Sequence, residues 1–180
     1  MRKLTHAELV IRQENQIAQQ VPLVVILNDI RSLYNVGSIF RTADGAGVKK
    51  VWLCGITGFP PDNQITKTAL GAEKSVAWEY ERDPCNVIQQ LKMEGYRILL
   101  LEQMESSIAY QDYDVTGPVC LVLGNEISGV SERLVSLCDG AVDIEMSGLK
   151  NSLNVSVAFG IVAYHLKNGL QKISQPTGTV

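Results

Sequence analysis

Three continuous apolar segments restrict the class of fold open to this chain. They are Val21–Leu27 (VPLVVIL), Arg97–Glu102 (RILLLE) and Pro118–Gly124 (PVCLVLG), and each carries apolar side chains on consecutive residues. A strand of this kind has both faces buried, as in a parallel sheet whose crossover helices cover its two sides. Helical patterns alternate with these segments and with shorter candidate strands. The sequence therefore predicts an α/β domain with a mostly parallel sheet and helices on both faces.

The length of 180 residues suits one domain with short extensions. Thr5 and Glu8 fit a capping box, so an N-terminal helix is expected in residues 1–20. The domain itself is expected over residues 21–170. The segment 171–180 is expected to be a disordered tail.

Within the domain, helices are expected over Val36–Ala46 and from Asp83-Pro84 to Gly95. Thr66–Ser75 is ambiguous between a short helix and a loop. A long apolar helix is expected over Leu153–Leu166, because Lys167-Asn168-Gly169 is a typical helix end.

Composition excludes several classes of protein. No apolar run reaches the roughly 18 residues of a membrane span, and the N-terminus lacks the apolar region of a signal peptide, so a cytoplasmic protein is expected. The formal net charge of −3 argues against a large nonspecific nucleic-acid surface but not against a local basic patch. His6 and His165 are far apart, and no metal site is expected. Free core thiols are expected for Cys54, Cys85, Cys120 and Cys138.

Familiar nucleotide and hydrolase motifs are absent. No G-x-G-x-x-G follows the first apolar segment, and no G-x-S-x-G occurs. Gly124–Ser131 (GNEISGVS) has the spacing of a phosphate-binding loop, but Val130 stands where that loop needs a lysine. The sequence thus excludes an NTPase and a serine hydrolase, and it disfavours a dinucleotide oxidoreductase.

Three polar loops remain, each after a predicted strand. Loops at the carboxyl ends of parallel strands converge on the ligand site of such folds. Their side chains are mostly uncharged, which suits a neutral or zwitterionic ligand with an amide-bearing ring better than a triphosphate. The loops carry Asn35, Gly37 and Arg41; Gly124, Asn125, Glu126 and Gly129; and Ser147, Gly148, Asn151, Ser152, Asn154 and Ser156.

These loops closely resemble the three motifs of the SpoU (TrmH-like) family of RNA ribose 2′-O-methyltransferases, within the SPOUT superfamily. The motifs are Asn35–Ala43 (NVGSIFRTA), Leu121–Ser131 (LVLGNEISGVS) and Ile144–Ala158 (IEMSGLKNSLNVSVA). Together they span about Pro22 to Leu166, nearly the whole chain. Three motifs in order are far more specific than any one of them.

The resemblance implies a SPOUT domain with a C-terminal deep trefoil knot, which binds S-adenosylmethionine, and a homodimer packed through the knotted region. The sequence departs from the pattern at Glu145, where many relatives have proline. Because Glu145 does not fix φ as proline does, the resemblance is a weaker guide to the adenosine contact of Met146.

The resemblance assigns catalytic roles to Asn35, Arg41, Glu126, Ser152 and Asn154. Arg41 taken alone would be a surface arginine paired with Asp44, but beside the other motifs it is expected at the reacting ribose. We expect it to clamp phosphate and ribose, since the pKa of a guanidinium is too high for a general base. Glu126 is expected to fix Arg41 or the loops. Ser152 is well suited to cap the final helix.

Cofactor contacts implied by the motifs are Gly124, Ile144 and Leu153, with Leu101, Gln103 and Met146 as neighbours. The chain carries no obvious additional RNA-binding domain, which favours a small folded RNA, and tRNA is predicted. Ribosomal RNA as the substrate, or a noncatalytic RNA-binding module of the same fold, are the alternatives. Positive residues near the site that are expected to bind RNA are Arg31, Lys67 and Lys74.

Overall fold

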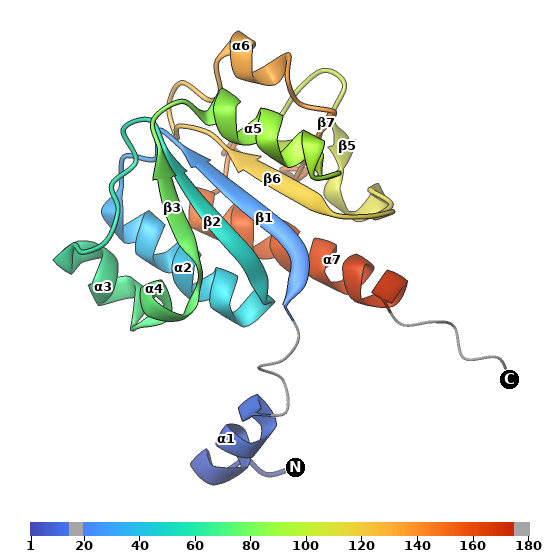
Figure 1. Ribbon diagram of the computed structural model, residues 1–180. Helices are drawn as coiled ribbons and strands as arrows, with labels where there is room; N and C mark the ends of the chain where they lie inside the picture. Colours follow the sequence, from blue (N-terminus) through green and yellow to red (C-terminus); the bar gives the residue numbers. More distant parts are fainter. Residues whose placement is uncertain (15–19, 175–180) are drawn as a thin grey trace, which may run out of the picture.

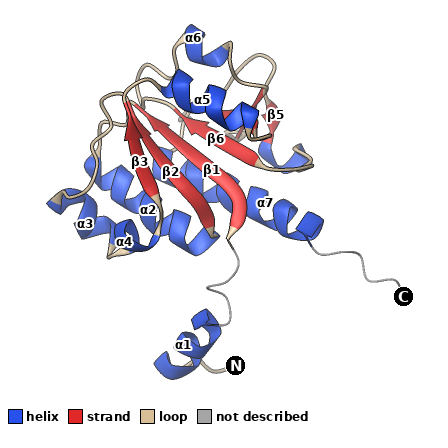
Figure 2. Cartoon of the chain, in the orientation of Figure 1, coloured by secondary structure: helices blue, strands red, loops and turns tan. Residues whose placement is uncertain are grey.

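The computed structural model describes residues 1–14 and 20–174. Within them, seven strands form one sheet in the order β3-β2-β1-β6-β4-β7-β5, and every strand pair is parallel (Figures 1 and 2). This confirms the predicted α/β fold with a mostly parallel sheet. The strands are β1 (Val21–Asn28), β2 (Val48–Cys54), β3 (Trp78–Glu81), β4 (Arg97–Leu101), β5 (Ile108–Ala109), β6 (Val119–Leu123) and β7 (Gly140–Asp143).

Helices cover both faces of the sheet, as predicted (Figure 2). On one face lie α2 and α7, with the short helices α3 and α4 packed on α2; on the other face lie α5 and α6. None of the described helices is long and apolar enough to span a membrane. The helices are α1 (His6–Glu14), α2 (Leu33–Ala46), α3 (Asn63–Ala69), α4 (Ala72–Ser75), α5 (Pro84–Met93), the 3₁₀ helix η1 (Tyr110–Asp112), α6 (Glu132–Val135) and α7 (Val155–Ser174).

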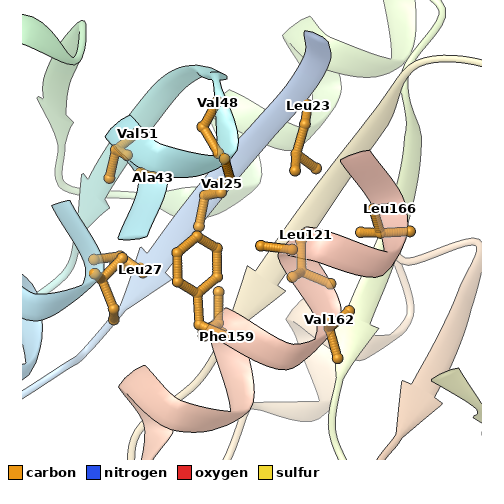
Figure 3. Packing of buried hydrophobic residues seen from close by; sticks show 14 of the residues in the cluster. Leu23, Val25, Leu27, Ala43, Val48, Val51, Leu121, Phe159, Val162 and Leu166 are labelled. Carbon is orange, nitrogen blue, oxygen red and sulfur yellow. The ribbon is translucent and has the colours of Figure 1, made fainter. Parts of the chain in front are cut away.

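Strand β1 is buried on both faces, which explains why polar residues do not alternate with apolar ones along it. Leu23, Val25 and Leu27 belong to the core on the side of α2 and α7, where Figure 3 shows them near Phe159. Val24 and Ile26 belong to the core on the side of α5 and α6. Both faces of the strand are therefore buried, and its carboxyl end is held rigidly in the centre of the sheet.

The first helix of the domain begins earlier than predicted, because a side chain caps it at an earlier residue. Helix α2 begins at Leu33 instead of Val36, because the Ser32 hydroxyl accepts a hydrogen bond from the Asn35 N–H at 3.3 Å and caps it. Asn35 therefore lies in the first helical turn and not in a loop. Thr5 and Glu8 form the predicted capping box of α1, while residues 15–19 of the predicted N-terminal helix lie outside the described residues.

The final helix is longer than predicted. It begins at Val155 and continues through Gly169 to Ser174, so residues 171–174 are helical and not part of a disordered tail. Gly169 stays in the helix because its missing side chain admits Val115, which would lie 2.6 Å from an added Cβ. Residues 175–180 lie outside the described residues, and the trefoil knot stays a prediction.

The ambiguous segment after β2 forms two short helices that pack on α2. At Gly37 an added Cβ would collide with the Thr68 hydroxyl and the Ile65 carbonyl. The absence of a side chain at this position therefore allows α2 and α3 to pack closely. The Thr68 hydroxyl donates to the Tyr34 carbonyl at 3.0 Å across this contact. The close approach fixes the position of Lys67 on α3 relative to α2.

Candidate active site

A cavity of about 1020 Å³ opens where the parallel strands β1, β6, β4 and β7 end. The loops that follow these strands form its wall, together with the first turns of α2 and α7. Ligands of open parallel sheets bind at this edge. The cavity is lined by Arg31, Ser32, Asn35, Leu101, Glu102, Gln103, Leu123, Gly124, Asn125, Glu126, Ile127, Ser128, Gly129, Asp143, Ile144, Met146, Asn151, Ser152, Leu153, Asn154, Val155 and Ala158.

The loop after β6 is a tight turn built around Asn125. Its side-chain oxygen accepts hydrogen bonds from the N–H groups of Ile127 and Ser128 at 2.9 and 3.0 Å. The backbones of Asn125 and Gly129 bond to each other in both directions, and Gly129 has a φ of 65°, which glycine adopts without strain. The Asn125 side chain also donates to the Asp29 carbonyl at 2.9 Å, so this turn is tied to the loop after β1.

Three side chains from the three motif loops form a continuous hydrogen-bonded network at the cavity. Asn154 donates to the side-chain oxygen of Asn35 at 3.1 Å, and Asn35 in turn donates to Glu126 at 3.1 Å. The other Glu126 oxygen lies 3.4 Å from the Arg31 backbone nitrogen, which donates to it. Asn35 thus has one amide N–H and its amide oxygen engaged, which fixes its amide orientation and leaves Glu126 as the anionic end of the network.

The third loop leads from β7 into α7, and the residue that caps α7 is not the predicted one. The side-chain oxygen of Asn154 accepts from the N–H and the hydroxyl of Ser156 at 2.9 and 2.7 Å, so Asn154 is the cap of the helix that begins at Val155. Ser152 lines the cavity two residues earlier and is not the cap. Gln103, after β4, donates to the Asn151 carbonyl at 2.8 Å and ties this loop to the sheet.

The structure brings most of the predicted site residues to this cavity. Four of the predicted catalytic residues line it, and they are Asn35, Glu126, Ser152 and Asn154. All the predicted cofactor residues line it, namely Leu101, Gln103, Gly124, Ile144, Met146 and Leu153. Of the predicted RNA contacts, Arg31 lines it, whereas Lys67 and Lys74 lie outside it, exposed on α3 and α4.

Arg41 is the predicted catalytic residue that the cavity does not include. It is exposed on α2 and lies six positions after Asn35, which corresponds to about 9 Å along the helix and about 120° around it. The predicted contact with Glu126 is therefore absent. The alternative pairing with Asp44 is absent too, since Asp44 accepts from the Ser75 hydroxyl at 2.6 Å, and Arg41 makes no hydrogen bond or ion pair with any part of the chain that the structure describes.

Sequence reasoning missed two carboxylates of the cavity wall. Glu102 directly follows β4, and Asp143 is the last residue of β7, where it accepts from the Ser107 hydroxyl at 2.5 Å. Their places at carboxyl ends of strands were the signal that could have found them. With Glu126 they give the described lining three carboxylates against the single cation Arg31.

A smaller cavity of about 360 Å³ adjoins the large one, and Gln103 and Asn151 line both. Both share Gln103, Asp143 and Met146, so the third loop separates two parts of one hollow region. In the described residues, no group of three or more His, Cys, Asp or Glu side chains is arranged to hold a metal ion.

The cysteines take no part in the site. All are free, and three of them, Cys54, Cys85 and Cys120, are buried. Burial raises the pKa of Cys54 to about 12 and that of Cys138 to about 11. Thiols with such pKa values carry almost no thiolate at neutral pH and are poor nucleophiles.

Comparison with known proteins identifies the family to which these loops belong. The model of the SpoU rRNA Methylase family matches residues 22–164. The chain belongs to the SpoU family. The matched range includes all three motif loops and the complete wall of the cavity, so the residues described above are those of the SpoU fold.

Curated SpoU relatives include tRNA (guanosine(18)-2′-O)-methyltransferases. A Thermus thermophilus protein of this name is 31% identical over 175 residues, which are 94% of this chain and 89% of that protein. The Aquifex aeolicus protein is 32% identical over 148 residues, covering 81% of this chain and 69% of the relative.

Solved SpoU structures have the same fold. The A. aeolicus TrmH/SpoU tRNA modifying enzyme superposes with a TM-score of 0.79 at 27% identity, over 95% of this chain and 90% of that one. AviRb of Streptomyces viridochromogenes, solved in complex with AdoMet, superposes with a TM-score of 0.77 at 25% identity, over 89% and 65% of the two chains.

Proposed function

We propose that this protein transfers a methyl group from S-adenosylmethionine (AdoMet) to a ribose 2′-hydroxyl of tRNA. Family membership and the names of the relatives support this activity. The observation that carries it is the Asn35–Glu126–Asn154 network, because it places the polar side chains of all three motifs at the mouth of one cavity. A module that only bound RNA would not need this arrangement.

The cavity fits AdoMet in size and chemistry. Its apolar side chains, Leu101, Ile144, Met146 and Leu153, suit an adenine ring, and Gly124 keeps the wall free of a side chain. The excess of carboxylates over cations favours a ligand with a net positive charge. When bound, AdoMet supplies a methyl group on a positively charged sulfur, which is already activated for attack by an oxygen.

The remaining work of the protein is alignment of the ribose. Reactions of this kind gain most of their rate from holding the attacking atom in line with the methyl group. We assign this role to Asn35 and Glu126, which offer a fixed amide and a fixed carboxylate at the cavity mouth, together with Ser152 and Asn154 of the third loop. Arg41 lies outside the cavity, so its role is to clamp an RNA phosphate that flanks the reacting nucleotide.

The substrate proposal rests on the relatives and on positive side chains around the cavity. Arg31 lies at its rim, and Lys67 and Lys74 are exposed on the helices packed against α2. We assign to these three the phosphates of the tRNA. The relatives make guanosine 18 the first nucleotide to examine, and both substrate and AdoMet are available in the cytoplasm, where we place the protein.

Nucleoside mass spectrometry tests this function directly. We expect tRNA from cells that lack the protein to lose one 2′-O-methylated nucleoside, and purified protein with AdoMet to restore it. If the protein methylates ribosomal RNA fragments and not tRNA, the proposed reaction stands and the proposed substrate is wrong. An unchanged nucleoside profile in both RNA classes, with no methyl transfer in vitro, would contradict the enzyme assignment.

We also propose that the protein is a homodimer. Val157 and Tyr164 on α7 are 50% and 44% exposed, and their spacing of seven residues puts them on one face of the helix. Tyr34 on the neighbouring α2 is 46% exposed. An apolar face of this kind is typically covered by a partner. Light scattering at micromolar concentration should give twice the mass of the chain. In the Val157→Glu variant the measured mass should fall to that of a single chain. A monomeric wild-type protein would contradict the proposal.

A further inference from the structure

An exposed aromatic cluster lies beside the candidate active site without a part in it. Phe59, in the loop after β2, packs on Tyr80 and Trp78 of the edge strand β3, with ring centroids 4.9 and 6.3 Å apart. Phe59 and Tyr80 are 47% and 41% exposed, whereas Trp78 is half-buried against the core. Trp78 thus anchors the cluster, and the other two rings present their surfaces to solvent.

The cluster is held in place by the loop after β2, which is hydrogen-bonded to the loop after β1 that lines the cavity. Tyr80 donates its hydroxyl to the Gly55 carbonyl at 2.8 Å. The Thr57 hydroxyl donates to the Leu27 carbonyl and accepts from the Ile30 N–H, both at 2.9 Å. Ile30 directly precedes Arg31, which lines the cavity. The aromatic loop and the cavity rim are therefore one rigid unit.

The order of the strands in the sheet gives the distance between the aromatic cluster and the cavity. Strands β1, β2 and β3 are parallel neighbours whose carboxyl ends come together at the upper left of Figure 1. At a spacing of about 4.8 Å per strand, the end of β3 lies about 10 Å from the end of β1, where the cavity begins. A short run of linked nucleotides spans this distance.

The charges around the cluster are compatible with RNA. Of the carboxylates next to the cluster in sequence, Glu79 pairs with Lys50 at 2.7 Å and Asp83 with Arg133 at 2.9 Å, whereas Glu81 accepts a hydrogen bond from the Asp83 N–H at 2.9 Å. The cationic side chain of Arg82 is exposed two residues after Tyr80. Rigid, exposed aromatic rings next to a positive charge are the elements with which proteins bind unpaired bases.

We propose that Phe59 and Tyr80 form a stacking platform for an unpaired base that flanks the methylated nucleotide. This inference rests on the proposed function, since it extends the RNA site of the same enzyme. The platform binds the base through its π-face, so it contributes affinity and orientation without reading the base sequence.

The test compares Phe59→Leu, which keeps an apolar side chain without an aromatic ring, with Phe59→Trp, which keeps the ring. The probe is bulk tRNA from cells that lack the protein, and binding is measured over a salt series. Phe59→Leu should raise the Kd for this RNA about tenfold at every salt concentration, leaving the slope of log Kd against log salt unchanged. Phe59→Trp should retain wild-type affinity.

Two controls separate stacking from other effects. Met93→Ala, at the far end of α5 and 84% exposed, should leave the Kd unchanged. Lys67→Gln with Lys74→Gln should lower the salt slope, as loss of phosphate contacts does. AdoMet affinity, measured by calorimetry, should be the same in all variants.

The outcomes distinguish this inference from the proposed function. If wild-type protein methylates tRNA and Phe59→Leu binds it as tightly as Phe59→Trp, the platform is wrong and the enzyme assignment stands. If Phe59→Leu changes the oligomeric state and not RNA affinity, the cluster is a contact between copies of the chain and the platform is again wrong. If wild-type protein neither binds nor methylates tRNA, the proposed function fails first, and the platform fails with it.

Discussion

Replacing Arg41 by alanine is expected to lower the turnover number for methyl transfer at least about 100-fold, because a ribose whose flanking phosphate is no longer clamped loses its alignment with the methyl group, and a misplacement of about 1 Å is enough for such a loss. AdoMet affinity should not change, because Arg41 is exposed on α2 and does not line the cavity. The fold should not change either, since the side chain has no hydrogen bond or ion pair with the described residues. Single-turnover kinetics with tRNA, and calorimetry with AdoMet, measure the two effects separately.

Two further variants identify what the arginine supplies. Arg41→Lys keeps the charge but loses the two-pronged geometry, and we expect it to be nearly as impaired as alanine. Arg97→Ala removes another exposed arginine at the amino end of β4, whereas the cavity lies at the carboxyl ends of the strands, and this variant should be fully active. Near-normal turnover in a folded Arg41→Ala protein would remove Arg41 from the mechanism.

Much of the fold could be predicted from the sequence because its apolar runs are unusually clear. Val21–Leu27 has no polar alternation, and a strand with two buried faces needs helices on both sides of its sheet. The ends of the helices could not be predicted as well. Glycine commonly ends a helix, but Gly169 is needed inside α7 for contact with Val115, a residue distant in sequence.

Site residues whose positions follow from the order of the strands could be predicted from the sequence. Contacts that depend on side-chain orientation could not be predicted as well. Gly124, Ile144 and Leu153 lie in loops that follow strand ends, and parallel strands necessarily bring those ends together. The orientation of Arg41 depends on where α2 begins, and the cap by Ser32 fixes that. The link from Asn35 to Glu126 joins residues ninety-one positions apart, and no local pattern indicates it.

The second large effect is expected at Gly124, at the end of β6. A Cβ added there would collide with Val130 and lie 2.9 Å from the Gly129 backbone, so Gly124→Ala must push the turn that follows β6 outward. This turn is closed on itself through Asn125, so it moves as a unit. Its movement strains the hydrogen bonds that tie it to its neighbours, from Asn125 to the Asp29 carbonyl and from Asn35 to Glu126. Overpacking of this kind costs about 1–3 kcal/mol, which corresponds to about 5- to 150-fold in AdoMet affinity.

Turnover should fall further than affinity in Gly124→Ala, by about 100-fold or more. The displaced turn carries Glu126 away from Asn35, and a misplacement of about 1 Å in an aligned site is enough for such a loss. Gly117→Ala, just before the amino end of β6, is the matched control, because no atom lies within 4 Å of its added Cβ, and both its AdoMet affinity and its turnover should remain close to wild type. Circular dichroism establishes that both variants are folded. Wild-type AdoMet affinity in folded Gly124→Ala would mean that the cofactor does not bind against this turn, and the cavity would then have to be assigned to another ligand.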